Sequence, residues 1–154
     1  ATGFHVTDYP IGQRIFDAAG RSLAARWSTA AAPTAFRGTT TTGFPNLFVL
    51  TGPNTGLGHS SQVFMIEAQI RYVLGALAHA RTHHLTRLEV RPAAQAGWDR
   101  AVQRKMPGTV WLTGGCHSWY LDDRGRNVTL WPGSTWSFAW RTRRFDPASY
   151  HQDS

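Results

Sequence analysis

The chain has 154 residues, of which 42% are hydrophobic and 16% charged, a composition typical of one globular domain. The net charge is +7, but the sixteen basic residues are scattered and densest only at Arg141, Arg143 and Arg144, which disfavours a nucleic-acid partner. No apolar run is long enough to cross a bilayer, so we expect no membrane partner. A single cysteine, Cys116, excludes an internal disulfide and favours a reducing, cytoplasmic location.

The first residues, Ala1–Phe4, look like the end of a strand, with neither an initiating Met nor a signal peptide. We therefore expect a piece of a longer protein, with part of a sheet absent. Next, the segments 14–16 and 22–24 flank Asp17–Gly20, which predicts a hairpin with Gly20 at a positive backbone angle. The Ala-, Thr-, Pro- and Gly-rich stretch Trp27–Gly43 predicts an extended connection.

The centre of the sequence combines a predicted strand, a glycine-rich turn and a long helix. Leu47–Thr51 is a continuous apolar run between Pro45 and Gly52, which favours a strand buried on both faces, in the middle of a sheet. Gly52, Gly56 and Gly58 then allow a sharp turn, and Ser60 or Ser61 can cap the helix that follows.

The predicted helix is strongly apolar. Three- and four-residue spacing assigns its inward face to Val63, Ile66, Ile70, Val73, Leu74 and Leu77. Phe64 and Met65 make its first turns apolar nearly all round, so we expect a deeply buried beginning. The N-terminus of such a helix offers unpaired N–H groups and a positive dipole end, which suits an anion or an electron-rich ring.

Beyond the helix, Leu85–Val90 predicts a short strand, and Pro92 suits the first residue of a second helix. That helix stops at Pro107-Gly108, and its inward residues are Trp98, Ala101, Val102 and Met106. Thr109–Thr113 is apolar, and 118–121 is predicted to pair with 128–131. We expect residues 1–131 to form the body and residues 132–154 an aromatic, basic tail packed on it. Five of the seven tryptophans follow residue 105, either as core or as an aromatic surface.

We consider three further groups of residues as candidate metal-binding or catalytic sites. His79 and His83 have a metal-ligand spacing, with His84 adjacent, but no carboxylate or cysteine lies near, so no metal is predicted. Neighbouring Cys116 and His117 would point to opposite faces of a strand, which disfavours a thiolate nucleophile. Third, residues 58–62 are similar to the G-x-S-x-G elbow of hydrolases, which leaves a serine hydrolase of α/β type as an alternative.

The hydrolase hypothesis needs Ser60 or Ser61 to join Asp122 and His151, which follow in the appropriate chain order. Gln62 replaces the closing glycine of the elbow, and the serines stand well past the predicted strand. We therefore predict that these groups lie far apart.

A set of short motifs is more specific in combination. They are Ala1-Thr2-Gly3-Phe4, Gly43-Phe44-Pro45-Asn46-Leu47-Phe48, Gly52-Pro53-Asn54, Ile66-Glu67 and Ser118-Trp119-Tyr120. In order and spacing this set resembles the C-terminal portion of flavin-dependent Baeyer–Villiger monooxygenases, from the first residue to about Asn127. Residues 52–59 look closest to the branch that acts on aryl ketones such as hydroxyacetophenones.

The resemblance implies an α/β fold, namely the C-terminal part of a flavoprotein with two Rossmann-like dinucleotide-binding domains, with an incomplete sheet and one long buried helix. It implies FAD and NADPH as cofactors and insertion of an oxygen atom into a small ketone. Thr2 and Gly3 would belong to the link, residues 1–4, between the NADPH and FAD domains. Gly52, Pro53 and Asn54 would lie beside the flavin ring, with Ser61 and Gln62 near its pyrimidine side. Trp119 would close over the nicotinamide cofactor and exclude water from the substrate pocket.

Some family features are missing from this sequence. It contains neither a G-x-G-x-x-G fingerprint nor F-x-G-x-x-x-H-x-x-x-W-P, so the resemblance implies a missing N-terminal FAD- and NADPH-binding portion. No catalytic residue is assigned in this chain, which we expect to be inactive alone. Leu121-Asp122-Asp123 replaces the family's common Gly-Ala-Asn. A flavin enzyme oxidising nitrogen, sulfur or alkane carbon would share most of these motifs and remains an alternative.

Overall fold

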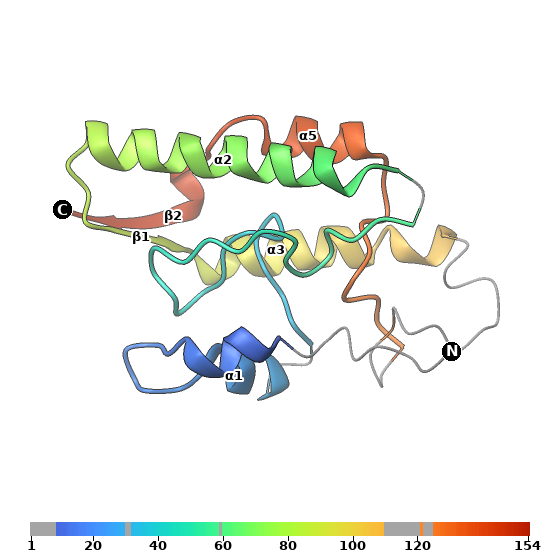
Figure 1. Ribbon diagram of the computed structural model, residues 1–154, viewed down its shortest axis with the longest axis horizontal. Coiled ribbons are helices and arrows are strands. Elements are labelled where there is room, and N and C mark those ends of the chain that lie inside the picture. Colours follow the sequence, from blue (N-terminus) through green and yellow to red (C-terminus); the bar gives the residue numbers. More distant parts are fainter. Residues whose placement is uncertain (1–8, 30–31, 59, 110–120, 122–124) are drawn as a thin grey trace.

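The computed structural model describes residues 9–29, 32–58, 60–109, 121 and 125–154. The elements, in chain order, are η1 (Pro10–Arg14), α1 (Leu23–Thr29), α2 (Gln62–Thr82), β1 (Arg87–Val90), α3 (Pro92–Gln103), η2 (Met106–Gly108), α5 (Thr135–Thr142), η3 (Pro147–Ser149) and β2 (Tyr150–Asp153). The long α2 and the short α5 lie side by side along one side of the molecule, with the sheet and α3 below them and α1 at the opposite edge (Figure 1). Within the described residues, no helix is both long and apolar enough to cross a membrane.

Helix α2 links the two main hydrophobic clusters of the core, because its buried residues belong to both of them. The first cluster joins α2 to both strands and consists of Phe36, Tyr72, Ala76, Leu88, Val90 and Tyr150. The second joins it to α3 and α5 and consists of Met65, Ala68, Val102, Met106, Trp131 and Phe138. In a smaller cluster, Leu23 and Trp27 of α1 pack with Phe44.

The start of α2 is as predicted, but its buried face is not. Ser61 is the N-cap, and its Oγ accepts a hydrogen bond of 3.4 Å from the N–H of Phe64. Val63 and Ile70, which the spacing placed inward, are 62% and 41% exposed. The buried face is instead formed by Met65, Ala68, Gln69, Tyr72 and Ala76. Because α2 is apolar nearly all round, periodicity alone could not select the face, and its small alanines allow the closer approach.

The predicted central strand at Leu47–Thr51 is wrong. Asn46 and Thr51 have positive φ angles of 59° and 53°, which interrupt an extended backbone at both ends. Between them, the N–H of Val49 donates to the carbonyl of Thr39, at 2.7 Å, within an irregular loop. Leu50 is 42% exposed. The described residues therefore contain only a two-stranded antiparallel sheet rather than the expected interior of a larger one.

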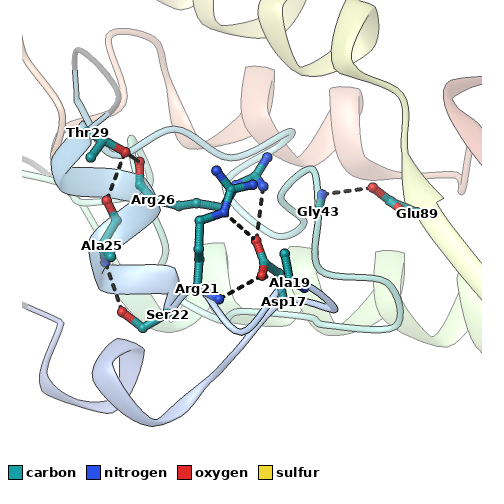
Figure 2. Close-up of polar contacts among 9 residues, drawn as sticks. All are labelled: Asp17, Ala19, Arg21, Ser22, Ala25, Arg26, Thr29, Gly43 and Glu89. Atoms are coloured by element: carbon teal, nitrogen blue, oxygen red, sulfur yellow. Dashed lines mark hydrogen bonds and ion pairs between the residues drawn. The ribbon is translucent and has the colours of Figure 1, made fainter.

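The N-terminal turn is confirmed, with Gly20 at φ 74° and an antiparallel bridge between Phe16 and Ser22. The Asp17 carboxylate accepts hydrogen bonds from the N–H groups of Ala19 and Arg21, and from both arginine side chains at positions 21 and 26 (Figure 2). Ser22 Oγ accepts from the N–H of Ala25, at 3.1 Å, and so caps α1. The predicted extended connection from Trp27 is therefore helical up to Thr29.

The second half of the chain contains predicted and unpredicted elements. Strand β1 and helix α3 confirm the expectations for Leu85–Val90 and for the helix opening at Pro92. Helix α5 was not predicted; Ser134 caps it, and it packs against α2. Strand β2 then pairs antiparallel with β1, so that His151 lies opposite Glu89. Of the predicted apolar stretch Thr109–Thr113, only Thr109 is among the described residues.

Candidate functional site

The glycine-rich loop before α2 is held against residues 127–131. The N–H of Asn54 donates to the carbonyl of Val128, at 3.0 Å, and the N–H of Gly56 donates to that of Thr129, at 2.8 Å. The N–H of Trp131 returns a bond of 2.9 Å to the carbonyl of Gly56. Pairing of 128–131 with 118–121 was predicted instead; of that pairing, only an antiparallel bridge between Leu121 and Asn127 falls among the described residues.

At two positions of the loop, the local backbone geometry restricts which residue type fits. A Cβ atom on Gly52 would lie 2.5 Å from the carbonyl oxygen of Gly38, so only glycine allows this close approach. Asn54 has a φ of 58°, which asparagine tolerates better than most residues. Its side-chain Nδ2 donates to the carbonyls of Asn127, at 2.8 Å, and Leu130, at 3.3 Å. The Gly52-Pro53-Asn54 turn is thus buried and firmly positioned within the chain.

Gln69 anchors this region to α2, a role that the sequence reasoning missed. Its Oε1 accepts from the N–H of Thr51, at 3.0 Å, and its Nε2 donates to the carbonyl of Gly38, at 2.8 Å, and to Thr39 Oγ1, at 3.0 Å. The side chain is completely buried. No clear signal of this role is present in the sequence, because Gln69 lies between the charged residues Glu67 and Arg71, and periodicity did not show that its face of α2 is buried.

The N-terminus of α2 lies at the exposed end of the loop. Gly58, Ser60 and Ser61 are exposed, whereas Gln62 is half-buried and donates from Nε2 to the carbonyl of Thr55, at 3.2 Å. The first turn of α2 contains no acidic residue that would oppose the positive end of the helix dipole. This arrangement favours a ligand group that carries negative charge or partial negative charge, so the residues present fit the negative pyrimidine side of a reduced flavin.

The structure brings five of the eight sequence-predicted site residues into one loop-and-helix unit. These are Gly52, Pro53, Asn54, Ser61 and Gln62. Thr2, Gly3 and Trp119 lie outside the described residues.

The alternative sites gain no support from the described part of the chain. Ser61 caps the N-terminus of α2, whereas His151 lies in β2, which contacts the other half of that helix through a hydrogen bond of 2.7 Å between His79 and Gln152. Asp122, the third member of the predicted hydrolase triad, is outside the described residues. Among the residues described, no group of three His, Cys, Asp or Glu side chains is arranged to hold a metal ion.

Comparison with solved structures defines the class of fold. The chain superposes along its whole length on 29% of cyclohexanone monooxygenase from Rhodococcus sp. Phi1 bound to NADP+, with a TM-score of 0.77 and 22% identity. For 91% of the chain it superposes on 26% of an oxidised steroid monooxygenase bound to NADP, with a TM-score of 0.75 and 23% identity. The fold is therefore that of one part of a flavin monooxygenase.

Sequence comparison identifies the family more narrowly. Over 97% of its length the chain is 51% identical to a Baeyer–Villiger monooxygenase of Streptomyces coelicolor, and 52% identical to one of Pseudomonas aeruginosa. It spans only 28% of the length of each of these relatives. No protein-family model matches the chain. The chain is thus homologous to a portion of the Baeyer–Villiger monooxygenases, as the sequence motifs indicated.

Proposed function

We propose that the full-length protein containing this chain is a FAD- and NADPH-dependent monooxygenase that inserts an oxygen atom into a ketone to give an ester. The observation that carries the proposal is the identity of 51% and 52% to two Baeyer–Villiger monooxygenases over nearly the whole chain. FAD, reduced by NADPH, would supply the oxygen-activating chemistry, which no amino-acid side chain provides. The finer fold assignment, a part of the FAD-binding domain with residues 132–154 packed on it, belongs to the same proposal.

The contribution of this chain would be to position and stabilise one side of the flavin. The exposed N-terminus of α2, at Ser61 and Gln62, would place its positive dipole end toward negative charge on the ring. Gly52-Pro53-Asn54 would keep the loop in a fixed position beside the ring, because Asn54 is hydrogen-bonded to residues 127–131. Thr2 and Gly3 would belong to the link between the NADPH and FAD domains, and Trp119 would close over the nicotinamide cofactor.

The test is oxidation of NADPH by the full-length protein in the presence of ketones, with labelled oxygen gas. We expect ketone-dependent NADPH consumption and one labelled oxygen atom in an ester product. An N-oxide, a sulfoxide or a hydroxylated alkane as the only labelled product would overturn the ketone assignment while leaving a flavin monooxygenase. An aryl ketone compared with a cyclic aliphatic ketone would test the predicted branch.

A further inference from the structure

Helix α2 has three faces, of which two are covered within the chain. One face packs into the two main clusters through Met65, Tyr72 and Ala76. A second faces α5, where the rings of Phe64 and Trp136 meet edge to face with centroids 5.2 Å apart. The third face has no covering element among the described residues, yet it is apolar.

The side chains of this third face form an apolar stripe, defined as Val63, Ile66, Ile70, Val73, Leu74 and Leu77. Val63, Leu74 and Leu77 are 62%, 59% and 52% exposed, and Ile70 is 41% exposed. Their spacing keeps them on one side of the helix, over about 21 Å at a rise of about 1.5 Å per residue. A continuous aliphatic surface of this kind marks an interaction site.

We propose that the apolar stripe of α2 is the docking surface for the remainder of the full-length protein, an inference that rests on the proposed function. The relatives are much longer, since this chain spans 28% of them and leaves 72% of their length unrepresented. The stripe also begins at Val63, in the first turn of α2, beside the exposed loop end at Gly58 and Ser60. A flavin-binding portion that reaches the N-terminus of α2 must therefore come within one helical turn of the stripe.

The surface that covers the stripe must itself be apolar. Between Val63 and Leu77 the charged side chains of α2 are Glu67 and Arg71; Glu67, four residues after Val63 and three before Ile70, lies at one edge of the stripe, and Arg71 lies further round the helix. Apart from Glu67 at that edge, the stripe is aliphatic and offers no basic group to pair with an acidic partner. The occupant is therefore an apolar helix or sheet face of the flavin-binding portion, held by burial of aliphatic side chains.

The test replaces two residues of the stripe and compares them with a matched pair on the same helix. Leu74→Asp with Leu77→Asp places two carboxylates in the stripe. Arg71→Asp with Ala78→Asp places two carboxylates at exposed positions outside it. Both pairs should leave the melting temperature of the isolated 154-residue chain nearly unchanged, because all four positions are exposed there.

Each pair is then placed in a chimera, in which this chain replaces the aligned residues of the Streptomyces coelicolor relative. We expect the stripe pair to lower the melting temperature and the soluble yield of the chimera, and the control pair to leave both near those of the unsubstituted chimera. Equal melting temperatures for the two pairs would overturn the docking proposal. In a second arm, the isolated chain is mixed with the rest of the relative, expressed separately, and complex formation is followed by size-exclusion chromatography. The stripe pair should weaken association at least about tenfold, and absence of any complex with the unsubstituted chain would overturn the proposal.

The outcomes separate this inference from the proposed function. A chimera that is destabilised by the stripe pair but consumes no NADPH with any ketone supports the docking surface and contradicts the function. A chimera that oxidises ketones and keeps its melting temperature with the stripe pair supports the function and contradicts the docking surface. Self-association of the isolated chain that is lost in the stripe pair, with no binding to the rest of the relative, would assign the stripe to a second copy and overturn the proposal.

Discussion

Gly52 stands where two loops of the chain come into close contact, since its Cβ position would lie 2.5 Å from a backbone oxygen of Gly38. Neither backbone can move without disturbing the loop that leads to α2. We expect Gly52→Ala to lower the free energy of unfolding by about 1–3 kcal/mol, the usual cost of forcing an added methyl group into a filled space. Urea denaturation followed by tryptophan fluorescence measures it.

Gly97 provides the control for Gly52. It lies within α3, where an added Cβ would meet only the flexible end of Arg100, at 4.0 Å. Gly97→Ala should therefore raise the free energy of unfolding by about 0.5–1 kcal/mol, because alanine favours helix over glycine. If both substitutions destabilise the chain equally, the close approach at Gly52 is not the reason.

The interactions of the Asp17 carboxylate should make the free energy of unfolding depend on pH. The hydrogen bond from the backbone of Arg21, followed by the Arg26 side chain, holds the pKa of the Asp17 carboxyl below its ordinary value of 3.8. A lowered pKa in the folded state means that the ionised group stabilises the fold above this value, and that the contribution disappears as pH falls through the lowered pKa.

The measurement for Asp17 is the free energy of unfolding of the natural chain and of Asp17→Asn between about pH 6 and about pH 2. We expect the natural chain to be the more stable at the upper end. The difference should shrink below about pH 4, where carboxyl groups begin to take up protons. A difference that stays constant over the whole range would show that the charge of Asp17 contributes nothing.

At the scale of elements, Gln69 joins α2 to the loop of residues 38–51. Gln69→Leu keeps the size of the side chain but removes the partners of the Thr51 N–H and the Gly38 carbonyl. Buried groups without a partner are costly, so we expect a loss of about 2–4 kcal/mol in the free energy of unfolding. Glu67→Leu, on an exposed position of the same helix, should change it by less than about 0.5 kcal/mol. Equal small effects would show that Gln69 does not anchor the loop.

The sequence predicted where the regular elements lie better than how they face. The N-cap at Ser61, the helix opening at Pro92 and the strand ending at Val90 follow from local signals, and the structure confirms them. The buried face of α2 depends on which neighbours reach it, and an all-round apolar helix carries no local record of them. Likewise, the apolar run at Leu47 lacks a neighbouring strand in the described residues and so does not become extended structure.

The candidate site shows the same division. Glycine spacing indicated the turn at Gly52 and the capped start of α2, because both arise from residues close in sequence. The partner of that turn, residues 127–131, lies more than 70 positions away, as the hydrogen bond from Asn54 to Asn127 spans 73 residues. Nothing in a single sequence specifies such a pairing, and so the support given by Asn127 and Gln69 was missed.

For the whole molecule, we expect the isolated chain to bind FAD weakly and to be catalytically silent. It supplies one side of the proposed flavin site, but most of the affinity for a dinucleotide comes from its pyrophosphate and adenosine, which need a glycine-rich fingerprint that this sequence lacks. Titration of FAD, followed by flavin fluorescence, and NADPH oxidation with and without a ketone are the measurements. A stoichiometric yellow protein that consumes NADPH would contradict this expectation.

The hydroxyl groups around Tyr150 couple distant parts of the chain. Tyr150 bonds to Thr40 across 110 positions, at 2.9 Å, and to Tyr72 across 78 positions, at 3.0 Å. Closing such long loops costs entropy before any contact repays it, and contacts between distant residues slow folding. During synthesis, therefore, Phe36 and Tyr72 remain without the ring that completes their cluster until β2 has been made. The cluster that begins with Phe36 is therefore completed only by β2, so its packing cannot be finished before Tyr150 has been synthesised.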